Sequence, residues 1–208
     1  MTALKFMIVL GILGHGINMY CDRILSIFPN GKLMLKNIQK IREGDYAAKL
    51  MEGVSPSIPL RSGVLGIFAI VLEFFGYAAL AAYGYQQAKW LGVLLLVETT
   101  YSCIVSSAYH IKCGLAEYVF LKYDRTEKAR DIMLDLMDSG AVLRTCFVAY
   151  VAYLITLIVA IVTGVIGFPI WAVIFTVLPL FILLYPFQII GTVHLSAMIS
   201  MFVWLLLI

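Results

Sequence analysis

One apolar segment of this sequence carries an unusual concentration of reactive side chains. The stretch "ETTYSCIVSSAYH", residues 98–110, contains a carboxylate, several hydroxyls, a thiol and an imidazole. At 100° per residue, Glu98, Ser102, Ser106 and His110 fall on one side of a helix, and the opposite side is apolar or aromatic. Because an ionisable group in hydrocarbon is costly, we expect this stripe to face a bundle interior or a water-filled cavity and to mark a functional site.

Other apolar segments supply polar side chains that could meet this stripe. His15, Asn18 and Asp22 recur at i, i+3 and i+7, which places them on one face of a helix. Glu73 stands inside the apolar run "IVLEFFGY", and His194 lies in the last apolar segment. All three histidines of the chain therefore fall in apolar segments, where a buried polar site is the expected reason for them.

The helical rise of 1.5 Å per residue predicts two polar layers in the bundle. The layer near the edge contains Asp22, His110 and His194, and the layer nearer the middle contains His15, Glu73 and Glu98. We also expect Glu98 to contact a residue of the first helix, because these two helices have the longest polar faces.

The composition identifies the elements that must position these residues. Of 208 residues, 62% are hydrophobic and 13% charged, and the mean hydropathy is +0.98, which is typical of a polytopic membrane protein. About 20 residues are needed to cross a hydrocarbon core of ~30 Å. The sequence therefore predicts an all-α transmembrane helical bundle forming a single integral membrane domain over residues 1–208. Its six predicted spans are about 4–22, 63–86, 90–112, 145–166, 169–186 and 188–208.

Basic residues are concentrated in the two long loops that follow the first and third predicted spans. Of the 15 lysines and arginines, all but Lys5 and Lys89 lie in or beside these loops. The positive-inside rule then places both loops in the cytoplasm and both termini outside, in a multi-pass protein of the cell membrane. The net charge of +3 is explained by contact with anionic membrane lipids, so we expect no nucleic-acid partner.

Each long loop also contains an apolar pattern of helical period. Met34, Ile38 and Ile41 share one face in the first loop, and Met133 and Leu136 share one in the second. These patterns predict amphipathic helices that lie along the inner membrane surface or cap the bundle.

The spacing of Ser106 and His110, taken with Asp22 and His194, resembles a pattern in the alkaline ceramidase and adiponectin-receptor superfamily of membrane hydrolases. The resemblance implies a zinc ion held by His110, His194 and His15, with Asp22 and Ser106 as catalytic groups beside it. Such a site activates water against a lipid amide or ester. That superfamily has seven spans and a further histidine in its last helix, which this sequence lacks. Over its full length the chain also resembles six-span bacterial membrane proteins whose second helix opens on a pattern like "LRSGVLG", and this second resemblance implies no activity.

Three functions fit these residues. The first is a metal-assisted intramembrane hydrolase acting on a lipid-like amide or ester. The second is a small transporter or ligand-binding membrane protein, in which Asn18, Glu73, Glu98 and Ser102 join the histidines in a proton or cation relay. The third is an accessory membrane subunit whose polar residues only join helices. The absence of a glycine-rich phosphate loop and of a Gly-x-Ser-x-Gly element argues against nucleotide and serine-hydrolase chemistry.

Overall fold

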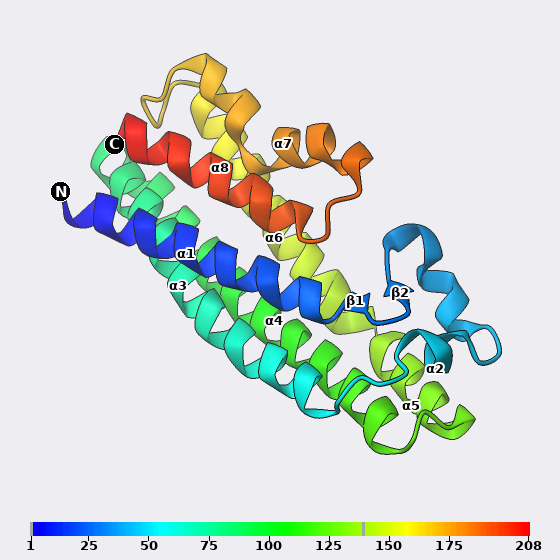
Figure 1. Ribbon diagram of the computed structural model, residues 1–208. Helices are drawn as coiled ribbons and strands as arrows, with labels where there is room; N and C mark the ends of the chain where they lie inside the picture. The colour runs from blue at the N-terminus through cyan, green and yellow to red at the C-terminus, as the bar shows by residue number, and fades with distance from the viewer. Residues whose placement is uncertain (1, 139) are drawn as a thin grey trace.

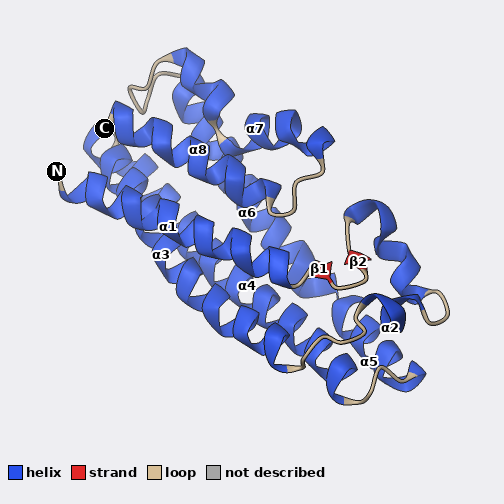
Figure 2. Ribbon diagram, viewed as in Figure 1, coloured by secondary structure: helices blue, strands red, loops and turns tan. Residues whose placement is uncertain are grey.

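The computed structural model describes residues 2–138 and 140–208, and these residues are almost entirely helical (Figures 1 and 2). The α-helices are α1 Ala3–Ile24, α2 Tyr46–Leu50, α3 Ser57–Gln87, α4 Lys89–Lys122, α5 Glu127–Asp138, α6 Gly140–Val162, α7 Val177–Leu184 and α8 Thr192–Leu207. The other described elements are the 3₁₀ helices η1 Leu35–Arg42, η2 Ile170–Phe175 and η3 Tyr185–Phe187 and the two strands β1 Ile27–Phe28 and β2 Gly31–Lys32. The all-α class predicted from the sequence is confirmed.

Within the part of the chain that the structure describes, four segments are long and apolar enough to cross a membrane, namely α1, α3, α4 and the segment that ends with α6. Both α3 and α4 are longer than the predicted spans, and α4 continues to Lys122, through residues expected in a loop. The six predicted spans are not confirmed. The 16 residues of α8 rise only about 24 Å, less than a hydrocarbon core of ~30 Å.

The predicted fifth span, 169–186, is not one helix. Pro169 precedes η2, and Thr176 has an extended backbone between η2 and α7. Pro179 lies in the first turn of α7, where proline is tolerated, and Pro186 lies in η3 directly after it. Because proline lacks the amide hydrogen that an interior helical position needs, these prolines divide the segment into short pieces.

The helices that carry the polar residues pack closely (Figure 1). Helix α1 contacts α3 and α8, α3 contacts α4, and α4 contacts α6. A Cβ atom at Gly14 would lie 2.6 Å from the carbonyl oxygen of Ala69 and 2.7 Å from the backbone nitrogen of Glu73. Since no side chain fits there, α1 and α3 approach through their backbones directly beside His15.

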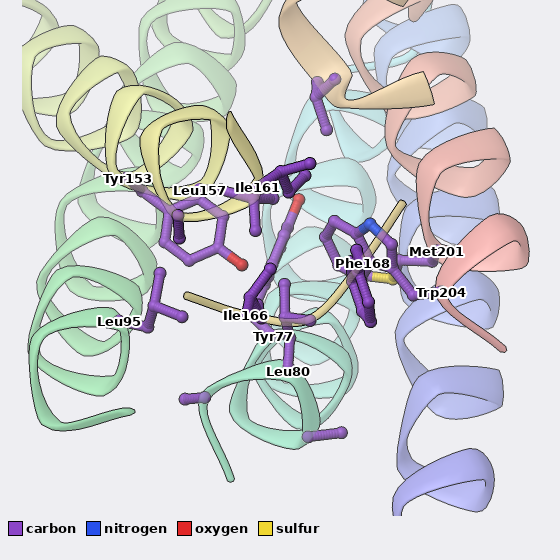
Figure 3. Packing of buried hydrophobic residues seen from close by; sticks show 14 of the residues in the cluster. Tyr77, Leu80, Leu95, Tyr153, Leu157, Ile161, Ile166, Phe168, Met201 and Trp204 are labelled. Atoms are coloured by element: carbon purple, nitrogen blue, oxygen red, sulfur yellow. The ribbon is translucent and has the colours of Figure 1, made fainter. Parts of the chain in front are cut away.

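An aromatic and aliphatic core fills the bundle toward the end where both termini lie (Figures 1 and 3). The ring of Tyr77 on α3 meets Tyr153 of α6 edge-on, with centroids 5.2 Å apart, and Trp204 of α8 at 6.0 Å. Tyr77 is also the residue that connects this core to the polar site, because its hydroxyl contacts His15.

The opposite end of the bundle is covered by the antiparallel hairpin of β1 and β2, by η1 and by α2 and α5 (Figure 1). Phe120 near the end of α4 belongs to a buried apolar cluster with Met51 of the first loop and Met133 of α5. Arg42 of η1 donates two hydrogen bonds to the carboxylate of Asp138 on α5, at 2.6 and 2.7 Å. The two polar segments of the chain thus form one cap, and its position on a membrane surface remains a prediction.

Candidate metal centre

Two histidines and a glutamate meet where α1, α3 and α8 converge. His15 Nδ1 lies 3.0 Å from Glu73 Oε1 and 3.1 Å from His194 Nδ1, and His194 Nδ1 lies 3.5 Å from the same oxygen. His15 and Glu73 are 2% and 7% exposed, and His194 is half-buried. Among residues 2–138 and 140–208, no other three His, Cys, Asp or Glu residues bring their ligand atoms within 4.8 Å of one another.

Each of the two imidazoles is oriented through its other nitrogen. His15 Nε2 lies 2.9 Å from the hydroxyl of Tyr77, and the two rings meet edge-on. His194 Nε2 lies 3.6 Å from Asp22 Oδ2. Histidines that bind metals commonly donate their outer N–H to a hydroxyl or carboxylate, which fixes the ring and its tautomer. Both Nδ1 atoms are therefore held toward Glu73.

The carboxylate of Glu73 is also fixed from α1. Asn18, which is buried, donates a hydrogen bond from Nδ2 to Glu73 Oε1 at 2.7 Å. The helical face predicted from His15, Asn18 and Asp22 is therefore assembled in the structure, and each of its members contacts the site.

The position of His194 depends on the turn that begins α8. Gly191 precedes the helix with φ of 81°, a conformation that L side chains rarely adopt. A Cβ atom at Gly191 would lie 2.7 Å from Cγ of Met19 on α1. The glycine therefore lets the start of α8 lie against α1, and His194 follows within the first turn.

A cavity of about 330 Å³ adjoins the metal-ligating group, which consists of His15, Glu73 and His194. Side chains of α1, α3, α4, α6 and α8 line it. Thr99 and Ser102 of α4 place buried hydroxyls in its wall, and neither hydroxyl has a hydrogen-bond partner in the described part of the chain. The site thus has both ligand atoms and free hydrogen-bonding groups around one cavity.

The polar stripe predicted on residues 98–110 faces this cavity. Ser102, Ser106 and His110 are among its lining residues. On the opposite face of α4, Val97 and Ile104 are 60% and 63% exposed. The predicted inward face is therefore observed for Ser102, Ser106 and His110, whereas Glu98 of the same stripe is not among the lining residues.

His110 lines the cavity but does not belong to the metal-ligating group. Its Nε2 donates a hydrogen bond to the carbonyl oxygen of Ser62 on α3 at 3.1 Å. A Cβ atom at Gly66 would overlap the imidazole, so the ring lies directly against the α3 backbone. The structure therefore brings Glu73, which the sequence suggested as a relay residue, to the place that the resemblance gives to His110.

Two other predicted residues contact α6 instead. Glu98 Oε1 accepts a hydrogen bond from Thr156 Oγ1 at 2.8 Å, so the predicted contact of Glu98 with the first helix is wrong. Ser106 Oγ lies 3.3 Å from Cys146 Sγ, in the wall of the cavity. The predicted layers also change, because His194 joins the inner residues and Glu98 leaves them.

A family comparison covers nearly the whole chain. A model described as a family of unknown function (DUF6796) matches residues 1–206, a range that includes the three metal-ligating residues. Comparisons with curated proteins and with solved structures give no match. The chain therefore belongs to this family of unknown function, DUF6796.

Proposed function

We propose that the protein binds a divalent transition-metal ion, in the first instance zinc, through His15, Glu73 and His194. The observation that carries this proposal is the spacing of the three ligand atoms, 3.0, 3.1 and 3.5 Å. In a tetrahedral site with bonds of about 2.0–2.1 Å, neighbouring ligand atoms lie about 3.3–3.4 Å apart. Two histidines and one glutamate are also a known ligand set for catalytic zinc, which keeps its fourth position for water or substrate.

We further propose that this site hydrolyses an amide or ester bond of a small lipid-like molecule. A zinc ion at such a site supplies an activated water and polarises a carbonyl group. The cavity wall supports an amphiphilic substrate, because Phe147 and Leu143 of α6 line it and are 67% and 44% exposed. An apolar molecule could approach through this wall from the membrane.

The chain's own residues would divide the remaining tasks. Asp22 orients the imidazole of His194, and Asn18 orients the carboxylate of Glu73. The free hydroxyls of Thr99 and Ser102 are placed to bind the polar part of a substrate, and Ser106 lies in the same wall. These groups would fix the positions of the metal ligands and of the substrate, and such positioning is a large part of an enzyme's rate enhancement.

The hydrolase proposal predicts metal-dependent turnover. Purified protein in mixed micelles should cleave fluorogenic acyl esters or N-acyl amides, lose this activity on chelation and regain it with Zn²⁺. Glu73→Gln should lower kcat/KM by about 100-fold or more, because the amide is a poor ligand for the metal. Glu52→Gln, at an exposed position, is the matched control. A protein that contains metal but cleaves no ester or amide would exclude the hydrolase.

A proton or cation relay is the second candidate, and one observation favours it. Contacts run continuously from Asp22 to His194 at 3.6 Å, on to His15 at 3.1 Å and then to Tyr77 at 2.9 Å. Chains of carboxylates and imidazoles at membrane depth can carry protons. In this case the wild type would contain no metal above background, and His15→Ala would change proton-coupled uptake in proteoliposomes.

We also propose that the cap faces the cytoplasm and that both termini lie outside. The basic loops form the cap at one end of the bundle, and the termini lie at the other end (Figure 1). In a variant without native cysteines, Lys40→Cys and Asp131→Cys should resist an impermeant thiol reagent applied to intact cells. Ala88→Cys, between α3 and α4, should react. Labelling of Lys40→Cys and Asp131→Cys from outside would contradict the proposed orientation and indicate the opposite one.

A further inference from the structure

A second cavity of about 370 Å³ lies between the site and the cap. Asp22, Tyr109, His110 and Leu143 line both this cavity and the one beside the metal-ligating group. The two spaces therefore adjoin around Asp22. The carboxylate of Asp22 lies 3.6 Å from His194 Nε2. Asp22 therefore separates the second cavity from the metal-ligating group.

Glu117 of α4 is buried in the wall of this second cavity. The residue is 3% exposed, and its Oε2 has no hydrogen-bond partner among the residues that the structure describes. A buried carboxyl group without a partner is costly, because nothing replaces the water that it loses. Because no hydrogen bond within the described residues satisfies this oxygen, we expect it to bind a ligand that enters the cavity.

The charges around Glu117 select a cation as that ligand. The basic side chains given for this cavity wall are Arg42 and His110, and both are already engaged. The Arg42 guanidinium is bound to the carboxylate of Asp138 at 2.6 and 2.7 Å, and His110 donates to the carbonyl oxygen of Ser62 at 3.1 Å. That ion pair is half-exposed and bridges η1 and α5 at the cap. Glu117 and Asp22 are left as two acidic groups in succession, from the cap toward the site.

We propose that this second cavity is an antechamber that binds a divalent metal cation in transit, which passes from Glu117 to Asp22 and on to His194. The inference rests on the proposed metal site. The described residues around Glu117 do not bring three ligand atoms together, which favours brief binding over permanent residence. An ion moves along a path when each site binds it strongly enough for entry and weakly enough for release.

The proposal predicts a defect in the rate of metal uptake with no defect in final binding. Full-length protein freed of metal would be mixed with Co²⁺, and the visible absorption of the four-coordinate ion would be followed by stopped flow. Glu117→Gln should slow loading by roughly tenfold, since a charged approach can raise association rates by 10-fold or more. The final Co²⁺ content and affinity should stay within about twofold of wild type, because Glu117 is not among the metal-ligating residues.

Glu98→Gln is the matched control, because Glu98 lies on the same helix and lines neither cavity. Its loading rate should equal that of wild type. A test on unmodified protein uses Mg²⁺, a hard cation that prefers oxygen ligands, which should slow Co²⁺ loading without lowering the final content.

The outcomes separate the antechamber from the metal site. Loading of Glu117→Gln at the wild-type rate, or of wild type unaffected by Mg²⁺, would overturn the antechamber and leave the metal site standing. Wild-type protein that takes up no Co²⁺ would instead overturn the proposed function itself.

Discussion

His194→Ala is expected to leave the purified protein with little of the wild-type metal content and to abolish measurable hydrolysis. A catalytic zinc normally has three protein ligands, so this change leaves two. The loss should exceed the ~100-fold that follows from removing an outer partner of a ligand. His194 is the ligand that α8 contributes to the group, and the other two lie on α1 and α3. Metal analysis of the protein after dialysis measures the effect directly.

His110→Ala is the matched control for this experiment, because it removes the same side chain from the wall of the same cavity. His110 donates to the Ser62 carbonyl and is not among the three metal-ligating residues, so the variant should retain its metal. Loss of metal from His110→Ala would support the ligand set implied by the resemblance. Retention of metal by His194→Ala would exclude both sets.

Asp22→Asn is expected to weaken metal binding by about 10–100-fold while leaving the stoichiometry unchanged at saturating metal. The Asp22 carboxylate lies 3.6 Å from His194 Nε2, and its negative charge beside this outer nitrogen should make the imidazole a better ligand. A neutral amide of the same shape keeps the packing but loses the charge. Competition with a chromophoric chelator would give the affinities of both proteins.

Asp131→Asn controls for the loss of one negative charge, because Asp131 is exposed on α5 in the cap. Its metal affinity should match that of wild type. If Asp22→Asn binds metal as tightly as this control, Asp22 does not act on His194.

The sequence alone was enough to predict the all-α class and the inward position of Ser102, Ser106 and His110 on α4. Polar residues at helical spacing between 98 and 110 are costly in lipid, so they were expected to face the interior and to leave the apolar side of the helix outside. The exposed Val97 and Ile104 agree with this expectation. The prolines at 169, 179 and 186 were visible as well, and they should have divided the predicted fifth span. Hydropathy alone counted that segment as a membrane helix because all of its pieces are apolar.

The grouping of the site residues could not be derived from spacing within single helices. Glu73 became a ligand candidate because backbone contact at Gly14 brings α1 and α3 together beside it. His194 joined the group because Gly191 turns α8 onto α1, which no periodicity reveals. His110 is not part of the metal-ligating group because its imidazole is hydrogen-bonded to a backbone carbonyl of α3. A backbone acceptor of this kind cannot be identified from residue types. Each of these depends on how two distant helices pack.

The most direct test of the metal site is the metal content of wild-type protein, purified without chelator and then dialysed after incubation with Zn²⁺. Three ligand atoms 3.0–3.5 Å apart predict about one equivalent of zinc per chain. X-ray absorption at the zinc edge should then show two imidazole nitrogens and carboxylate oxygen around the ion. Folded protein with zinc at background level would contradict the proposal, and the group formed by His15, Glu73 and His194 would then be a hydrogen-bonded cluster without a metal.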